Sequence, residues 1–444
     1  MSKKGIFLSV LAFVAASFLL SSGGYSAADN PAKSYMLIFQ YADLPENLGQ
    51  QIAVANGQMT AGIKQIGVAV ASSSDPKFIA KASRISGIRS VVSNPVVQWS
   101  PEPIIEEMAN GSDPAMFLVQ WYLEMIHAPE AWDFGARGEG VRIFVLDSGI
   151  DSDHPDLIHL NPALCKSFVP ITEGSEVMED WHVSPEIHFN HGTQVAGVIA
   201  AAQTNPDPNF DPGIIGVAPM AELVAVKVLS EKTETGLPSY LIQGIMWAAD
   251  HEADVINMSL AGYLPSRNGE TGEQLHALQR AINYAYQKGA TIVAAAGNSR
   301  IDADRDKNNV IFPAQLAHVI AVSAIAEPFP PDMLEDVPWN DSLTVGTNFG
   351  KTLVSFAAPG QNITTDNNSH KKGLRYVSGS GTSQAAAMVS GVAALIIGQN
   401  GGSLHPAQVN AILIQSADDL GKPGKDDYFG MGRVNAYKAV LYSR

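Results

Sequence analysis

Four polar residues of this chain carry the side chains that acyl transfer requires. Asp147 directly follows the apolar run 141–146, and Asn298 follows an apolar run that ends at Gly297. His191 and Ser383 each open a helical pattern. A serine can supply a nucleophile, a histidine a general base, a carboxylate the partner that fixes the histidine tautomer, and an amide a donor to an oxyanion. Together the four side chains predict acyl transfer at a carbonyl group.

The segment around Ser383 places a serine where a glycine-containing loop turns into a helix. It reads Gly-Ser-Gly-Thr-Ser-Gln-Ala-Ala-Ala over 379–387. We expect its glycines to take the positive φ values of a tight turn. The first helical turn offers unpaired N–H groups and a positive dipole end, so an oxyanion beside Ser383 would be stabilised. Serine also caps helices, so this segment alone leaves both a cap and a nucleophile open.

The elements that must position these residues follow from the apolar runs after residue 140. Runs without alternation predict buried strands, and segments with helical periodicity lie between them. This order predicts an α/β fold with a doubly wound, mostly parallel sheet, in which functional groups collect beyond the carboxyl ends of the strands. Asn257, like Asp147, lies at such a strand end. The predicted strands are 141–146, 222–229, 254–258, 291–295, 319–324 and 353–356, and the predicted helices are 192–203, 239–251, 273–288 and 384–399.

The N-terminal part of the chain has a different organisation. Lys3 and Lys4 precede the apolar run 6–20, which predicts a secretory signal peptide cleaved after Ala28. An uncleaved membrane anchor is the alternative, although the run is short for a membrane span. A small α+β module follows, and a link rich in proline and glycine leads to the large domain. The module's predicted strands are 35–39, 66–71 and 88–98 and its helix is 77–85; the breakers of the link are 101–103 and 110–114.

Composition excludes some classes of partner. The 444 residues include 28 Lys and Arg against 44 Asp and Glu, a formal charge of −16. An acidic surface argues against nucleic acid or an anionic membrane as the partner. The single cysteine, Cys165, cannot form an intrachain disulfide, and its surroundings at 163–169 predict a strand.

The motifs as a set resemble those of the subtilase family of subtilisin-like serine endopeptidases. Asp-Ser-Gly-Ile at 147–150 resembles the family's aspartate motif, His-Gly-Thr-Gln-Val-Ala-Gly at 191–197 its histidine motif, and Gly-Thr-Ser at 381–383 its serine motif. Asn298 matches the oxyanion asparagine. The chain order Asp, His, Ser is that of subtilisin. The resemblance extends from about Gln120 to Ala439 and includes 216–219, 257–260, 358–360 and 430–436.

This resemblance implies a complete set of functional parts. Asp147, His191 and Ser383 would form the catalytic triad and Asn298 the oxyanion hole. Substrate would be protein or peptide, and catalysis would need no cofactor. The residues implied in substrate binding are Ser259, Leu260, Ala261, Gly262, Ala296 and Gly297.

The resemblance also implies a domain organisation. Residues 1–28 would be a signal peptide, 29–112 an inhibitor-type propeptide that blocks the cleft and is removed by self-cleavage, and 113–444 the catalytic domain. The product would be secreted, outside the cell or in the periplasm, with no stable membrane anchor. A permanent accessory domain is the alternative for residues 29–112.

The chain departs from the family pattern at two places. Relatives carry methionine, proline and histidine where Gln384, Ala387 and Met388 stand, which affects the packing of the helix start rather than the chemistry. Ala261 replaces a glycine that lines the primary specificity pocket. We expect its methyl group to narrow the pocket and to favour smaller side chains before the scissile bond.

Rival interpretations exist for several of these residues. His182, His188 and His191 with Asp180 could hold a metal instead, although no HExxH-type helix supports this. Asp207, Asp211 and the acidic run 302–306 could bind a structural calcium ion, but solvated acidic loops are the preferred interpretation. An inactive binding protein with the same fold is the alternative to an enzyme, and the intact set of four polar residues argues against it.

Overall fold

The computed structural model describes residues 31–99, 104–107, 120–172, 175, 177–184, 186–187, 190–203, 213–326, 346–367 and 376–444. Of residues 104–107 only the backbone is described. Residues 32–444 form one compact unit. The predicted signal peptide, its cleavage site and the breakers 101–103 and 110–114 lie outside the described residues.

A parallel sheet forms the core of residues 120–444. Its strand order is β16-β15-β13-β11-β7-β9-β8, and all neighbouring strands run parallel. The central strands are buried along their whole length, as their continuous apolar runs require. The strands are β7 (Arg142–Asp147), β8 (Lys166–Ser167), β9 (Glu222–Lys227), β11 (Val255–Met258), β13 (Thr291–Ala295), β15 (Val319–Ile325) and β16 (Phe356–Pro359).

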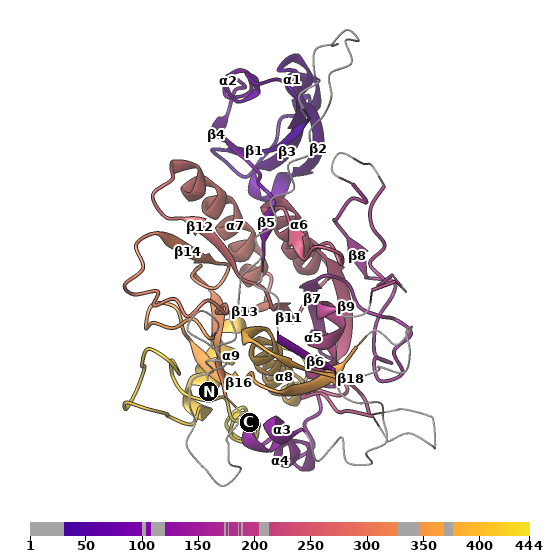
Figure 1. Ribbon diagram of the computed structural model, residues 1–444, viewed down its shortest axis with the longest axis vertical. Coiled ribbons are helices and arrows are strands. Elements are labelled where there is room, and N and C mark those ends of the chain that lie inside the picture. Colours follow the sequence, from indigo (N-terminus) through magenta and orange to yellow (C-terminus); the bar gives the residue numbers. More distant parts are fainter. Residues whose placement is uncertain are drawn as a thin grey trace, which may run out of the picture. The chain divides into compact units, whose positions relative to one another are not determined.

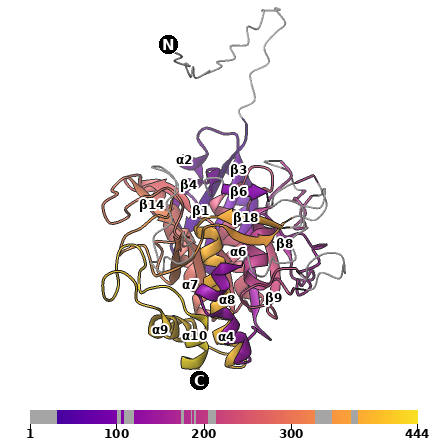
Figure 2. The ribbon, with the colours of Figure 1, turned by 60° about the horizontal axis from the view of Figure 1, so that its bottom comes forward.

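Helices cover this sheet, and one of them runs through the middle of the fold (Figures 1 and 2). This helix is α8 (Thr382–Gln399), whose residues from Thr382 to Ile397 are all buried. Among the described helices it alone is long and apolar enough to cross a membrane, but 89% of it is buried inside the protein, so it is a core helix. The others are α3 (Trp121–Met125), α4 (Ala128–Asp133), α5 (His191–Ala200), α6 (Pro238–Asp250), α7 (Gly269–Gln287), α9 (Pro406–Ser416) and α10 (Ala436–Tyr442).

The N-terminal module has its own antiparallel sheet, in the order β2-β3-β1-β4. One face of this sheet buries a separate apolar cluster that includes Leu37, Leu48, Ile52 and Phe78. The elements are β1 (Lys33–Phe39), α1 (Leu48–Val54), β2 (Gln58–Ile63), η1 (Lys64–Ile66), β3 (Val68–Ser73), α2 (Phe78–Ala82) and β4 (Ile88–Ser93).

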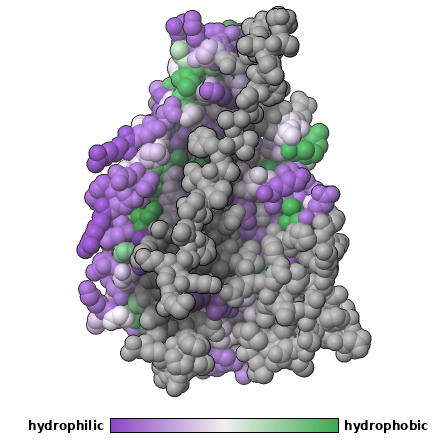
Figure 3. All heavy atoms as spheres, in the orientation of Figure 1, coloured by the Kyte–Doolittle hydropathy of each residue, from purple (hydrophilic) through white to green (hydrophobic). Residues whose placement is uncertain are grey.

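Three further sheets, each of two or three short strands, complete the described fold. β5 (Val97–Gln98) pairs with β10 (Thr235–Gly236), and β12 (Gly262–Pro265) pairs with β14 (Asn309–Phe312). β18 (Tyr376–Ser380) lies between β17 (Ile363–Asp366) and β6 (Ile104–Glu107). On the face seen in Figure 3, hydrophilic residues cover most of the described surface, and hydrophobic residues occur in small separate patches.

The predicted α/β class with a mostly parallel sheet is confirmed, and the differences from prediction are local. The strand predicted at 88–98 is divided into β4 and β5, because Pro95 between them cannot donate to a sheet. The strand predicted at 163–169 is only β8, at the sheet edge. The strand predicted at 353–356 lies too early in the sequence, since β16 begins only at Phe356. The helix predicted at 77–85 is the shorter α2.

Candidate active site

The side chains of Asp147 and His191 form a buried pair. Strand β7 ends at Asp147, and His191 is the first residue of α5. Nδ1 of His191 lies 2.9 Å from both carboxylate oxygens of Asp147. Because a carboxylate can only accept, Nδ1 carries the proton and Nε2 is the nitrogen left for other chemistry. Oδ1 of Asp147 also accepts a hydrogen bond from the backbone N–H of Ser148 at 2.7 Å, which fixes the carboxylate.

Hydrogen bonds between the start of α5 and the loop after β7 hold this pair in place. Asn190 caps α5, since its side-chain oxygen accepts from the N–H of Thr193 at 2.7 Å. Its Nδ2 donates to the hydroxyl of Ser148 at 3.1 Å, and that hydroxyl accepts from the N–H of Gly192, also at 3.1 Å. A side chain at Gly192 would collide with the backbone carbonyl of Gly149. Glycine is therefore required where the helix meets the aspartate loop.

The surroundings of His191 make it a stronger base than an ordinary histidine. Burial disfavours the charged ring and lowers its pKa, but the charge and hydrogen bond of Asp147, with the charge of Glu234, outweigh burial and raise the pKa of His191 to about 9. Nε2 is buried and accepts no hydrogen bond from any residue that the structure describes. The ring is thus fixed on one side and available on the other.

Ser383 lies in the first turn of α8 and is 2% exposed. Its Oγ donates to the carbonyl of Ser259 at 2.9 Å, and Oγ of Ser259 donates to the carbonyl of Ser383 at 2.7 Å. The hydroxyl is therefore directed to Ser259 and not to His191. For His191 to take the serine proton, the hydroxyl of Ser383 must turn so that it donates to Nε2 of His191 instead of to the carbonyl of Ser259.

The glycines before Ser383 are needed for space rather than for positive φ, so that expectation is wrong. Gly381 is extended, with φ 165° and ψ 167°, and Gly379 is not among the glycines with positive φ. A Cβ on Gly381 would lie 3.2 Å from both Nδ2 of Asn298 and Oε1 of Gln384. A Cβ on Gly379 would lie 2.9 Å from Nε2 of Gln384. Because Gly379 and Gly381 have no side chain, the amide side chains of Asn298 and Gln384 can reach the start of α8.

Asn298 follows β13 and is anchored to the residue before Ser383. Its Oδ1 accepts hydrogen bonds from the N–H and the hydroxyl of Thr382, at 2.9 and 2.8 Å. The same hydroxyl accepts from the N–H of Gly297 at 3.0 Å, and Gly297 has the positive φ of 93° that this turn needs. With Oδ1 fixed, Nδ2 faces Gly381. The amide donor thus lies beside the serine loop, as an oxyanion donor must.

A buried network below the serine was missed by sequence reasoning. Asn257 on β11 donates through Nδ2 to Oγ of Ser259 at 3.0 Å and accepts from the hydroxyl of Ser390 at 2.8 Å. Asn257 therefore supports Ser259 and ties β11 to α8, rather than lying open at the strand end. The available signal was spacing, since Ser390 follows Ser383 by two helical turns and shares its face.

The segment predicted to bind substrate contacts the chain's own Trp99, a residue that the sequence did not single out. The N–H of Ala261 donates to the carbonyl of Trp99 at 2.7 Å, and the indole Nε1 donates to the carbonyl of Gly236 at 3.1 Å. The indole is 1% exposed and packs edge-on against Phe312, with ring centroids 4.8 Å apart. A Cβ on Gly262 would collide with Phe312, so glycine there makes room for this aromatic pair.

Of the other residues predicted to bind substrate, two lie opposite each other and two are buried in the protein interior. A Cβ on Gly297 would lie 3.2 Å from Cβ of Ala261, so these two residues lie face to face. Leu260 and Ala296 are fully buried, and the carbonyl of Ala296 accepts from Nδ2 of Asn348 at 2.8 Å. Ser259, as described, binds Ser383. The structure thus brings the predicted segments 259–262 and 296–298 together beside the serine.

The acidic run 302–306 does not fit a calcium site, because its carboxylates bind protein donors. Asp304 accepts from the N–H groups of Lys351 and Thr352, at 2.9 and 3.0 Å. Asp302 and Asp306 accept backbone N–H groups of their own loop. Among the described residues, these side chains form no converging group of three. Asp207 and Asp211 lie outside the described residues.

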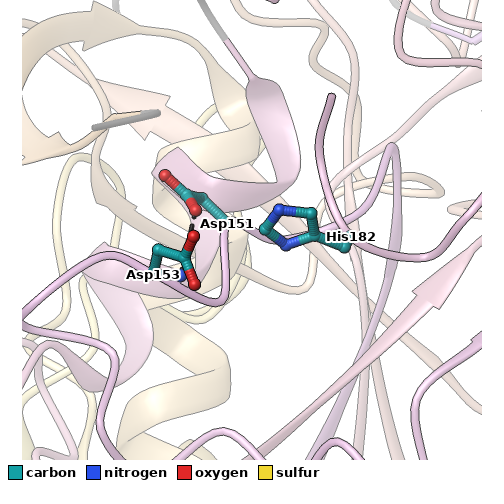
Figure 4. Close-up of side chains that lie close together, drawn as sticks. All are labelled: Asp151, Asp153 and His182. Atoms are coloured by element: carbon teal, nitrogen blue, oxygen red, sulfur yellow. Dashed lines mark hydrogen bonds between the residues drawn. The ribbon is translucent and has the colours of Figure 1, made fainter. Parts of the chain in front are cut away.

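Among the described residues, the histidine cluster weighed as a metal site does not come together. His182 lies beside Asp151 and Asp153 (Figure 4), whereas His191 contacts Asp147; His188 lies outside the described residues. Nδ1 of His182 is 2.9 Å from the hydroxyl of Ser152. Asp153 is exposed, so this group has the character of a solvated surface turn.

Comparisons with known proteins agree with this geometry. A model of the subtilase family matches residues 138–432. Thermitase from Thermoactinomyces vulgaris is 34% identical over 336 residues, which cover 74% of this chain and 99% of thermitase. Subtilisin Savinase from Lederbergia lenta is 35% identical over 322 residues, covering 72% and 98% of the two chains.

A solved structure shows the same fold at lower identity. It is a mutant of the epidermin leader peptide processing serine protease from Staphylococcus aureus, which superposes with a TM-score of 0.74 at 22% identity. The match covers 93% of this chain and 100% of that one. The chain therefore belongs to the subtilase family and is a subtilisin-like serine endopeptidase.

Proposed function

We propose that this subtilase is secreted and cleaves proteins through an acyl-enzyme on Ser383. Oγ of Ser383 attacks the peptide carbonyl while Nε2 of His191 takes its proton, and Asp147 holds the tautomer and stabilises the imidazolium. Nδ2 of Asn298 and the N–H of Ser383 donate to the oxyanion. His191 then gives its proton to the leaving amine, and a water molecule repeats the sequence to release the acid.

The observation that carries this proposal is the arrangement around Nε2 of His191. The neighbouring strands β7, β11 and β13 end at one edge, where they supply Asp147, the support Ser259 and Asn298. Helices α5 and α8 begin at the same edge with His191 and Ser383. One nitrogen of His191 is fixed by Asp147 at 2.9 Å and the other has no hydrogen-bond partner among the residues that the structure describes, which is the form a general base needs.

The N-terminal module that contains β1–β4 is, in this proposal, a propeptide that the enzyme removes itself. Side chains of α7 contact the N-terminal module: Glu273 forms a bidentate ion pair with Arg89, at 2.9 and 3.1 Å. Arg280 donates to the carbonyls of Phe39 and Ile66, at 2.8 and 3.0 Å. These polar, partly exposed contacts suit an interface that must later separate.

The end of this module supports a role as an internal inhibitor. β5 pairs with β10, Trp99 fills the space beside Ala261, and β6 pairs with β18, which leads directly into the Ser383 loop. The chain's own backbone thus occupies strands that a peptide substrate would use. We infer that the self-cleaved bond lies between Trp99 and Ile104, ahead of the boundary predicted at residue 112.

Secretion and self-processing can be tested together. We expect purified wild-type protein to hydrolyse casein and to begin, by N-terminal sequencing, between Trp99 and Ile104. The Ser383→Ala chain should be inactive and should begin near Asp29, since signal cleavage does not need its own active site. Identical trimming in both chains would contradict self-processing, and casein hydrolysis by the Ser383→Ala chain would contradict the proposed nucleophile.

A further inference from the structure

Two buried glutamine side chains lie beside the catalytic residues and have no role in the reaction described above. Gln194 belongs to the first turn of α5, which begins at His191, and Gln384 directly follows Ser383 in α8. Both residues are 0% exposed. None of their four amide atoms has a hydrogen-bond partner in the part of the chain that the structure describes. Because burying an amide without hydrogen bonds is unfavourable, this pair is suited to bind another polar group.

Both amides face Gly379 of β18. A Cβ at Gly379 would lie 2.9 Å from Nε2 of Gln384 and 3.3 Å from Oε1 of Gln194. The donor of one amide and the acceptor of the other therefore lie on the same side of this glycine. Gly379 does not have a positive φ, so its backbone conformation does not require glycine. Its missing side chain leaves the two amides uncovered by β18.

The two glutamines are held in fixed places beside the reacting carbonyl. The hydroxyl of Thr365 on β17 donates to the backbone carbonyl of Gln194 at 2.5 Å. At the other end of the pair, a Cβ on Gly381 would lie 3.2 Å from Oε1 of Gln384 and 3.2 Å from Nδ2 of Asn298. The amide of Gln384 therefore extends from Gly379 to Gly381, where it lies beside the proposed oxyanion donor.

Strand β18 is where the residues after the scissile bond would bind. β6 pairs with β18 in antiparallel orientation, with Ile105 opposite Gly379, and the self-cleaved bond proposed above precedes β6. A peptide substrate bound as a strand in this place presents its leaving-group residues to β18. Side chains directly opposite each other in an antiparallel pair lie on the same face of the sheet. The substrate residue opposite Gly379 therefore directs its side chain to the two glutamines, as does the residue two positions away.

The chemistry of the two amides defines the side chain that they can bind. Nε2 of Gln384 donates and Oε1 of Gln194 accepts, and a hydroxyl or carboxamide side chain can pair with both. An apolar side chain would leave both amides unpaired, and a charged one would lose water without meeting an opposite charge on either glutamine. The chain's own residue at this register position is Ile105, and isoleucine has no side-chain atom that forms hydrogen bonds.

We propose that Gln194 and Gln384 determine specificity on the leaving-group side of the scissile bond. They hydrogen-bond an uncharged polar side chain, that of serine, threonine, asparagine or glutamine, on the substrate residue opposite Gly379 or two positions nearer to the bond. The inference rests on the proposed acyl transfer at Ser383 and adds a substrate class to it. Such a substrate pairs with amides that Ile105 of the chain's own segment cannot satisfy.

The test is cleavage of a peptide library by the processed enzyme, with each residue after the scissile bond varied in turn. Threonine and valine are the matched pair, because their side chains differ in a hydroxyl and have nearly the same shape. We expect kcat/KM to be about 5- to 10-fold higher with threonine, the size of one net hydrogen bond. The preference should occur at alternate positions only, because side chains in between point to the other face.

A double variant locates the preference. Gln194→Met with Gln384→Met replaces both amides by apolar side chains of similar length and should bring the threonine-to-valine ratio to about one. Gln287→Met, at the exposed end of α7, should keep the wild-type ratio. The ratio is measured within one preparation, so it does not depend on how much of the enzyme is folded.

The outcomes separate this inference from the proposed function. The inference is overturned if the wild type cleaves peptides with no polar preference at any position after the bond, a result that does not depend on any variant. It is also overturned if the double variant keeps the wild-type ratio, since the amides would then serve only the packing or hydration of the interior. A wild type that neither cleaves peptides nor reacts with a fluorophosphonate at Ser383 would contradict the proposed function, and this inference with it.

Discussion

Replacing Asp147 by asparagine should lower the free energy of unfolding most at low pH and less as the pH rises. Asparagine keeps an oxygen for the N–H of Ser148 but removes the charge that faces Nδ1 of His191, 2.9 Å away. Without that charge, burial dominates and the pKa of His191 should fall below its ordinary value of 6.5.

The magnitude follows from linkage between protonation and folding. In the native protein the pKa of His191 is raised from 6.5 to about 9. A difference of about two and a half pH units, at about 1.36 kcal/mol each, amounts to about 3 kcal/mol. Because the folded state binds the proton more tightly, this stabilisation is complete below pH 6.5 and is lost as the pH rises through about 9.

The assay is urea unfolding of the Ser383→Ala chain with and without Asp147→Asn, from about pH 6 to about pH 10. The stability gap between the two chains should narrow by about 3 kcal/mol or more as the pH rises. The NMR titration of His191 should show the corresponding fall of its pKa in the asparagine variant. A gap that stays constant or widens with pH would refute the assigned coupling between Asp147 and His191.

Three further substitutions test other parts of the site. Asn298→Ala should lower turnover by ~10²–10³-fold with little change in KM, the size expected for one lost oxyanion donor, and an unchanged turnover measured on a peptide substrate would remove Asn298 from that role. Gly192→Ala should cost about 1–3 kcal/mol in thermal unfolding because the added carbon meets the backbone carbonyl of Gly149; the matched Gly272→Ala, where nothing lies within 4 Å, should not destabilise, and equal effects would contradict the packing argument. Ala261→Gly should shift cleavage of a peptide library toward larger side chains before the scissile bond, and an unaltered profile would show that its methyl group does not narrow the pocket.

The strands of the large domain were predictable because parallel strands buried on both faces must be apolar throughout. β13 has the bounds that its apolar run predicts, Thr291–Ala295. β16 lies later than predicted because pairing with β15, where Val322 faces Phe356, sets its register. Register between distant strands is a tertiary property that an apolar run does not encode.

The candidate site was predictable where local pattern and chemistry coincide. Asp147 at a strand end and Ser383 at a helix start could be found from their neighbours in the sequence. The choice of His191 among several nearby histidines could not be made by spacing, because its partner Asp147 lies 44 residues away in the chain. The resemblance to a known family supplied that choice.

Some contacts between remote segments could not be predicted. Trp99 contacts the predicted substrate-binding segment only because the fold brings Gly236 and Ala261 to it. Gly236 lies 137 residues away in the chain, and Ala261 lies further still. Single residues of ordinary type give no local signal when their role depends on which distant backbone approaches them.

The central claim is that Ser383 is a nucleophile activated by His191. The most direct measurement is the reaction of the purified, processed protein with a fluorophosphonate, followed by peptide mass spectrometry. We expect one adduct per chain, on Ser383, with a labelling rate that rises with pH toward the His191 pKa of about 9 and falls steeply in His191→Ala. An adduct on another residue, or equal labelling in His191→Ala, would contradict it.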